Sequence, residues 1–274
     1  MATDQRLLTA KLSYEFKTRL FWILWAAGIA GVLSFLLVDL SAVIAALPQP
    51  PGEPIELPHP ALLKLLGIIQ PAVLMTLAVL VGVWLAERVG LHAPAAEAAA
   101  RGDEFLSKLK PQILPGVLAG LASGVAIVLT WIIAKPFLSA EFVIRAEGFN
   151  KFIPAAVRLL YGGITEELLL RWGMMTFLVW AMWRLFQKGQ EAPASIYFVS
   201  AIIASAVLFG VGHLPIASAL AGGLSTPLVI YVITGNSIFG LVAGFLYWKK
   251  GLEAAIVAHM SAHIVLILAI NLAL

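Results

Sequence analysis

Three ionisable side chains lie inside an apolar part of the sequence, in the stretch GGITEELLLRWGMM at residues 162–175. Glu167 and Arg171 are four residues apart, so on a helix they share one face and can form a neutralising pair. Glu166 points about 100° away from them. Charged residues at the centre of a membrane helix cost about 2.5–3.5 kcal/mol to insert, so they usually pair and serve function. The stretch predicts one tethered and one free carboxylate; the alternative is that all three only hold helices together.

Three histidines lie in the apolar C-terminal half of the chain. His213 is followed by Pro215, which disfavours helix at the residue before it, so we expect His213 at a kink or helix end that lines a cavity. His259 and His263 are four apart and share one helix face. A lone membrane histidine is usually a hydrogen-bond partner between helices. Three histidines and a free glutamate on separate helices instead indicate a polar cavity within the membrane.

The composition places these residues in a membrane protein. Of the 274 residues 61% are hydrophobic and only 12% are charged, and the mean hydropathy is +0.96. Several apolar runs exceed the roughly 18 residues that a bilayer-spanning helix needs. The sequence has no cysteine, which excludes disulfides and thiolate chemistry. Its net charge of +3 is modest and gives no indication of nucleic-acid binding.

The apolar runs predict the fold and its parts. We expect an all-α polytopic membrane helix bundle of about seven to eight transmembrane helices, since isolated strands cannot satisfy their backbone in lipid. The expected spans are 21–47, 61–86, 113–133, 153–184, 195–220, 227–248 and 252–272. The proline-rich segment 48–60 connects the first two, and segment 92–110 is expected to be a helix at or outside the surface. Residues 1–150 would form the N-terminal membrane helices and cytoplasmic loop, and 151–274 the catalytic core, within one structural domain.

Lysine and arginine counts predict the orientation. Twelve lie in the N-terminus and the loops on its side, against three in the loops of the opposite side. We therefore expect a multi-pass protein with a cytoplasmic N-terminus. Counting residues along each span places Glu166 and His259 in the inner half and His213 in the outer half. The fifth helix must then start well inside the cytosol or break at 210–215.

Three motifs together resemble one family. EELLLR with Glu166, Glu167 and Arg171, FGVGH with Phe209 and His213, and HMSAH with His259 and His263 are similar in order and spacing to motifs of the CPBP intramembrane proteases. That family includes type II CAAX prenyl endopeptidases and Abi-like bacteriocin-processing or immunity proteins. The resemblance covers residues 150–274. One position departs from the family pattern, because His263 stands where the family has Asn or Asp.

The resemblance implies an intramembrane endopeptidase that hydrolyses a peptide bond of a membrane-associated protein or peptide near the cytoplasmic side of the bilayer. Glu166 would be the general base that activates water, and His213 would help to hold that water. His259 would stabilise the tetrahedral oxyanion and His263 would assist it. Glu167, Arg171 and Phe209 would give structural support.

Metal dependence stays open at this point. His213, His259 and His263 could supply three nitrogens to one Zn²⁺, with Glu166 as base or fourth ligand. The chain lacks the H-E-x-x-H motif of zinc proteases. Two other classes of protein also remain open. One is a non-catalytic immunity or scaffold protein with the same fold, and the other is a proton- or metal-coupled transporter, although transporters are expected to contain internal repeats and none is visible here. A structure that places Glu166, His213 and His259 around one cavity would favour hydrolysis over these two alternatives.

Overall fold

The computed structural model describes residues 2–40, 43–44, 47–48 and 59–272, and every regular element in this part of the chain is helical. Six of its helices are long and apolar enough to cross a membrane. The predicted all-α polytopic membrane bundle is therefore confirmed. Most of the predicted proline-rich connection 48–60 lies outside the described residues.

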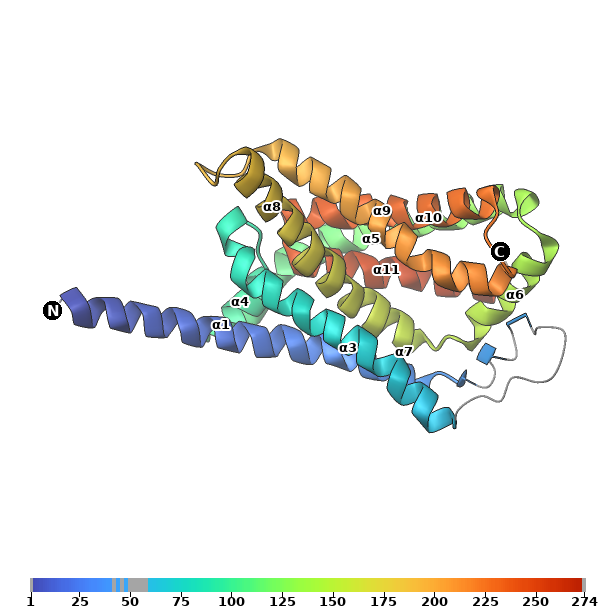
Figure 1. Ribbon diagram of the computed structural model, residues 1–274, viewed down its shortest axis with the longest axis horizontal. Coiled ribbons are helices and arrows are strands. Elements are labelled where there is room, and N and C mark those ends of the chain that lie inside the picture. The colour runs from blue at the N-terminus through green and yellow to red at the C-terminus, as the bar shows by residue number, and fades with distance from the viewer. Residues whose placement is uncertain (1, 41–42, 45–46, 49–58, 273–274) are drawn as a thin grey trace.

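The long helices run side by side along one axis of the molecule (Figure 1). The spanning helices are α1 (Ala2–Leu33) with η1 (Ser34–Leu37), α3 (Pro60–Leu85), α5 (Phe105–Ala134), α9 (Ser195–Ala221), α10 (Thr226–Lys249) and α11 (Leu252–Asn271). A further segment, 155–186, is helical without a break and packs against α1, α3, α9 and α11. It carries the EELLLR motif.

The first helix differs from its prediction. Its spanning part is Lys11–Leu37 rather than 21–47, and the helix itself begins at Ala2. The prediction followed the apolar run alone. Residues such as Gln, Arg, Leu and Lys, which are common before that run, form helix almost as well as Ala does, so the helix extends far beyond the apolar segment.

Helix α4 (Pro94–Arg101) was expected at or outside the surface, but it is packed into the bundle, against α1 and α5. Its alanines at 95, 96, 98 and 100 are buried. Glu253 on α11 accepts hydrogen bonds from the backbone N–H groups of Ala95 and Ala96, at 3.0 and 2.9 Å. These bonds satisfy donors that a helix start leaves unpaired. Helix α11 therefore begins inside the protein, beneath α4.

Glycines bring α11 close to α5. A Cβ atom at Gly116 or Gly120 would lie 2.8 Å or less from the backbone of α11, and one at Gly124 would lie 2.8 Å from Val265. Small residues repeated every four positions let membrane helices approach closely, so that van der Waals packing can hold them together. This contact fixes the helix that carries His259 and His263.

Helix α9 continues through Pro215, so the predicted helix end at His213 is wrong, whereas His213 does line a cavity, as expected. Proline is tolerated inside membrane helices because neighbouring groups satisfy the backbone that it frees. Leu252 through Ala255 at the start of α11 are buried within the protein, although Lys249 and Lys250 just before them are exposed.

The segment before the EELLLR motif contains a helix that was not predicted. Helix α6 (Ala140–Phe152) follows η3 (Lys135–Phe137) and contacts α9 and α11. Its apolar residues Phe142, Val143 and Ala146 are buried, whereas most of its charged side chains are exposed. It lies at the end of the bundle opposite the N-terminus (Figure 1).

Segment 155–186 comprises α7 (Ala155–Val157), η4 (Arg158–Thr165), η5 (Leu168–Met175) and α8 (Thr176–Phe186). The stretches η4 and η5 are π-helical: the N–H of Glu166 bonds to the carbonyl of Tyr161, five residues back. Such wide turns are rare and occur frequently at functional sites. Here they flank Glu166 and Glu167 on both sides.

Candidate active site

The predicted pair of Glu167 and Arg171 is present and fully buried. The Arg171 guanidinium donates to Oε1 of Glu167 at 3.1 Å and to the carbonyl of Gly240 on α10, also at 3.1 Å. Its guanidinium carbon lies 5.4 and 5.6 Å from the ring centroids of Phe209 and Phe239, within cation–π range. The pair thus joins the motif helix to α9 and α10.

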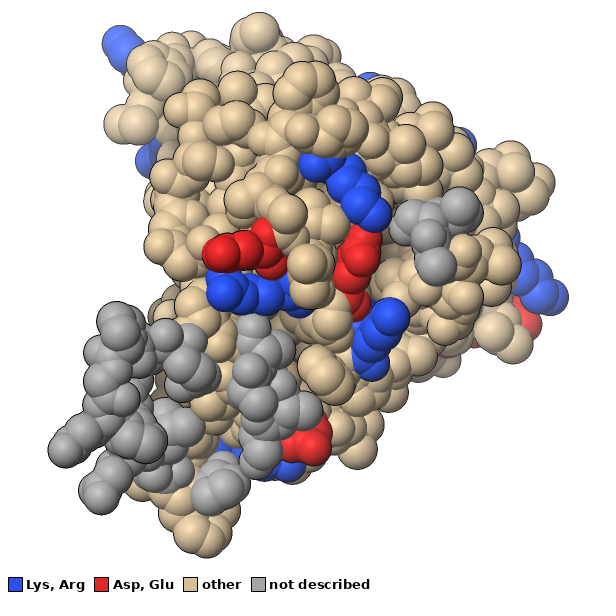
Figure 2. All heavy atoms as spheres, turned by 90° about the vertical axis from the view of Figure 1, so that its right-hand side faces the viewer, with Lys and Arg blue, Asp and Glu red and all other residues tan. Residues whose placement is uncertain are grey.

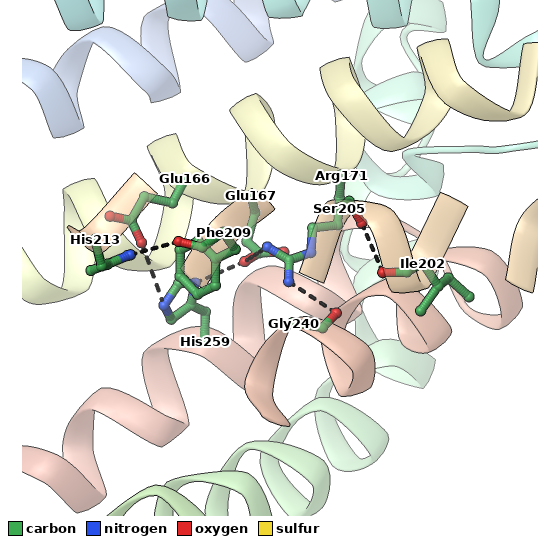
Figure 3. Close-up of polar contacts among 9 residues, drawn as sticks. All are labelled: Glu166, Glu167, Arg171, Ile202, Ser205, Phe209, His213, Gly240 and His259. Carbon is green, nitrogen blue, oxygen red and sulfur yellow. Dashed lines mark hydrogen bonds and ion pairs between the residues drawn. The ribbon is translucent and has the colours of Figure 1, made fainter. Parts of the chain in front are cut away.

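His259 connects this pair to the free carboxylate. Its Nδ1 lies 2.8 Å from Oε1 of Glu167, and its Nε2 lies 3.8 Å from Oε2 of Glu166 (Figure 3). The Glu167 carboxylate, paired with Arg171, can only accept, so Nδ1 carries the proton. In the neutral ring Nε2 is then unprotonated and faces Glu166. The partner of one ring nitrogen sets the state of the other.

Glu166 is the less constrained carboxylate. Its side chain is 18% exposed, whereas that of Glu167 is completely buried. No arginine or lysine among the described residues forms an ion pair with it. Figure 3 shows the carboxylate pointing toward His259 and away from Arg171. This geometry agrees with the prediction that one carboxylate, Glu167, is held in an ion pair and the other, Glu166, is free.

His213 and Phe209 lie one turn apart on α9. The Nδ1 of His213 is 2.8 Å from the carbonyl oxygen of Phe209, and because a carbonyl only accepts, Nδ1 is the donor. Nε2 is then an acceptor. The Phe209 ring meets the rings of both His213 and His259 edge to face, at centroid distances of 4.8 and 5.9 Å. Phe209 therefore separates and orients the two imidazoles.

His263 stacks on His259 with the ring centroids 4.8 Å apart and the planes 11° from parallel. Both of its ring nitrogens are buried and have no hydrogen-bond partner within the described chain. A Cβ atom at Gly162 would collide with its Nε2. Gly162 thus makes room for His263, the residue that departs from the motif pattern described above.

All four candidate catalytic residues line one cavity of about 580 Å³. Glu166, His213, His259 and His263 lie at its inner part. Apolar side chains form most of the remaining wall, from α5, α6, α9, α10 and α11, among them Trp131, Phe142, Leu220 and Leu266. A concave site with an apolar wall and a few convergent polar groups is typical of ligand pockets.

The cavity opens at the end of the bundle that carries α6. Its wall there includes Lys135, Glu147 and Lys151, all of which are exposed. The N-terminus lies at the opposite end (Figure 1). Hydrolysis near the cytoplasmic side and a cytoplasmic N-terminus are both expected from the sequence, and in the structure the charged residues of the cavity wall lie at the end of the bundle away from the N-terminus.

The four candidate metal ligands do not converge. Within the described parts of the chain, no group of three or more His, Cys, Asp or Glu side chains has a geometry that could hold a metal ion. The Nδ1 atom of His259 is bonded to Glu167 and that of His213 to a carbonyl, which leaves Nε2 of both rings without such a bond. His263 stacks on His259. The described side chains therefore do not form a preassembled three-histidine zinc site, and no step below uses a metal.

Sequence reasoning missed several polar residues of the cavity wall: Asn150, Arg158, Tyr161 and Asn236. Arg158 was within the predicted fourth span, and Asn236 within the sixth. The rule that picked out Glu166, that polar groups within apolar spans face the protein interior, could have found both. Asn150 gives no such signal, because the sequence analysis predicts no helix between 133 and 153.

A comparison of the sequence with known protein families matches the part of the chain that contains the candidate site. Residues 148–265 match the family described as type II CAAX prenyl endopeptidase Rce1-like. The match begins in α6 and ends in α11, so it contains every candidate catalytic residue. No curated protein and no solved structure gives a match.

Proposed function

We propose that this chain, whose residues 148–265 match the family model of type II CAAX prenyl endopeptidases, is an intramembrane endopeptidase in which Glu166 activates the attacking water. The substrate would be a membrane-associated protein or peptide. The observation that carries the proposal is that Glu166, His213 and His259, which come from three different helices, line one cavity. A scaffold without turnover does not need this convergence.

The hydrogen-bond partners of the two histidines support a specific way of holding water. His213 has its proton on Nδ1, so its Nε2 can accept one O–H of a water molecule. The Glu166 carboxylate can accept the other. A water that donates both protons in this way turns a lone pair toward a peptide carbonyl in the cavity, as general-base catalysis requires.

Glu166 and His259 can together carry out the proton transfers that hydrolysis of a peptide bond needs. Glu166 takes a proton from water while the oxygen adds to the carbonyl carbon, which leaves an oxyanion. His259 Nε2, 3.8 Å from Glu166 Oε2, can receive this proton and become an imidazolium that Glu167 stabilises through Nδ1. The imidazolium donates to the oxyanion and then gives the proton to the leaving amine as the C–N bond breaks. His263 stacks on this ring and holds its plane.

A comparison of cellular membranes tests this function without a known substrate. Membranes that contain the parent protein are compared by quantitative proteomics with membranes that contain Glu166→Ala. The control is Glu104→Gln, which removes an exposed carboxylate at the start of α5. We expect one or a few membrane-associated proteins to be shortened with the parent and the control and intact with Glu166→Ala. Identical peptide maps for all three proteins would contradict the proposal.

A further inference from the structure

We propose that Tyr247 is a positioning residue that acts, through Thr176, on the direction in which Glu166 points. It does so by holding a π-helical turn of the motif helix, residues 155–186. Neither Tyr247 nor Thr176 belongs to the cavity wall, so both act through the backbone of that helix. The consequence for catalysis rests on the proposed endopeptidase function, whereas the effect on the direction of Glu166 does not.

A chain of hydrogen bonds runs from α10 to the backbone of the motif helix. The hydroxyl oxygens of Tyr247 and Thr176 are 2.8 Å apart, and Thr176 Oγ1 donates to the carbonyl of Arg171 at 3.2 Å. A hydroxyl has one proton and a carbonyl only accepts, so Thr176 gives its proton to Arg171 and Tyr247 donates to Thr176. Both residues are almost completely buried. The direction of the whole chain is therefore fixed.

The chain ends on the carbonyl that closes the π-helical turn. The backbone N–H of Thr176 also bonds to the carbonyl of Arg171, five residues back. In an α-helix this carbonyl would accept from the residue four positions later, Met175. Thr176 thus gives one carbonyl two hydrogen bonds, from its backbone and from its side chain. Both favour the wide turn over an α-helical one.

The wide turn determines where Glu166 points. Such turns are rare and mostly interrupt α-helices singly. If the turn closed as an α-helix, it would contain one residue fewer. The part of the helix before it would then rotate by about 100° relative to α8 and move by about 1.5 Å, the increments of one residue. Glu166 precedes the turn, so it would no longer face His259 as it does now.

Helix α10 holds the turn at both of its ends. Arg171, at the start, donates to the carbonyl of Gly240 at 3.1 Å. Thr176, at the end, binds Tyr247 seven residues further along α10. Two attachments to one helix resist rotation of the segment between them. Tyr247 therefore acts on Glu166 from a position outside the cavity.

A single cysteine at position 166 reports this direction, because the sequence has no other cysteine. Glu166 lines the cavity and its side chain is 18% exposed, so Glu166→Cys should react with a thiol reagent. Figure 2 shows basic and acidic side chains together at the end of the bundle that carries α6. The reagent is therefore the uncharged N-ethylmaleimide, whose access does not depend on them. The labelling rate and the Tm are measured on the same sample in detergent.

The double variant Tyr247→Phe with Thr176→Val removes both hydroxyls and keeps the shapes of the side chains. Replacing both partners of a buried hydrogen bond by apolar groups can be nearly neutral for stability, so the Tm should stay close to that of Glu166→Cys alone. Labelling at position 166 should become about 2- to 10-fold slower, the shift in an equilibrium that one hydrogen bond produces. Thr176→Ser keeps the hydroxyl and should label at the parental rate.

Thr76→Val is the matched control, because Thr76 makes the same kind of chain within a regular α-helix. Trp25 Nε1 donates to Thr76 Oγ1 at 3.0 Å, and Thr76 Oγ1 donates to the carbonyl of Ala72, four residues back, at 2.7 Å. This control should leave labelling at position 166 unchanged. Unchanged labelling in the double variant would overturn the inference. So would faster labelling with a lower Tm, which would show that the hydroxyls only hold the fold together.

Kinetics separates this inference from the proposed function. With Glu166 restored, the double variant should lower kcat by the same factor as labelling and leave KM nearly unchanged, because a misdirected base affects the chemical step and not binding. If labelling slows but the parent cleaves nothing, the protease is wrong and the positioning stands. If the parent cleaves its substrate and the double variant changes neither labelling nor kcat, the positioning is wrong and the protease stands.

Discussion

The Nδ1 atom of His259 and the guanidinium of Arg171 share one oxygen, Oε1 of Glu167, at 2.8 and 3.1 Å. The sequence had indicated only that Glu167 braces Arg171. Because of this shared oxygen Glu167 has a second role. It also fixes the tautomer of His259, the histidine that faces Glu166.

Glu167→Gln should therefore destabilise the protein and impair the site. Breaking a buried ion pair leaves an uncompensated charge, which costs about 3–5 kcal/mol. Thermal unfolding in detergent measures this loss. The double variant Glu167→Gln with Arg171→Met should be less destabilised than Glu167→Gln alone, since it removes the stranded cation. If Glu167→Gln unfolds no earlier than the parent, the pair does not contribute to stability.

Zinc content gives an independent test of the donor geometry. Because no three candidate ligands converge within the described chain, we expect purified protein to hold far less than one equivalent of Zn²⁺ and to keep its activity in chelator. One equivalent of zinc, lost in both His213→Ala and His259→Ala, would show that the histidines rearrange around a metal.

The orientation can be measured because the sequence has no cysteine. Single cysteines placed by Asp103→Cys and Glu141→Cys lie at exposed positions near opposite ends of the bundle. The lysine and arginine bias predicts that a membrane-impermeant thiol reagent reaches position 141 in intact cells and position 103 only after lysis. The reverse pattern would place both the N-terminus and α4 outside, and the cavity mouth in the cytoplasm.

The connection between α3 and α4 should make stability depend on pH. His92 Nδ1 lies 3.4 Å from Oε1 of Glu97, and the hydrogen bond to Glu97 raises the pKa of His92 above its ordinary 6.5. Burial alone would raise the pKa of Glu97, but hydrogen bonds from His92 and the Ala93 N–H outweigh it and lower that pKa below 4.5.

The two shifts define where this contact stabilises the fold. The His92 contribution is fully present below pH 6.5 and is lost as the pH rises through its raised pKa. The Glu97 contribution is present above pH 4.5 and is lost as the pH falls through its lowered pKa. His92→Gln should thus lower the Tm near pH 6 more than in alkaline buffer. A Tm difference between parent and variant that does not change with pH would contradict this.

Much of the site could be predicted from the sequence because charge is so unfavourable in lipid. Glu166, Glu167, Arg171 and the two C-terminal histidines stand out against apolar spans, and their four-residue spacing fixes which of them share a helix face. The close contact between Gly162 and His263, by contrast, joins two helices and becomes visible only in the structure.

Features set by long-range packing could not be predicted. The burial of α4 and the deep start of α11 depend on Glu253, whose partners at Ala95 and Ala96 lie more than 150 residues away. Pro215 indicated a possible break, but α9 continues through it as one helix. The side on which the cavity opens depends on α6, which the sequence did not distinguish from a loop.

The central claim is that Glu166 is the base, and one measurement on a single preparation tests it. Proteolysis of a confirmed substrate and thermal unfolding are measured together for the parent, Glu166→Gln and the surface control Glu104→Gln. A general base contributes about 10²–10⁴-fold in rate, so Glu166→Gln should lose most proteolysis. It should unfold no earlier than the parent, because it removes a largely buried charge that has no cationic partner among the described arginines and lysines. Cleavage by Glu166→Gln at the parental rate would contradict the account.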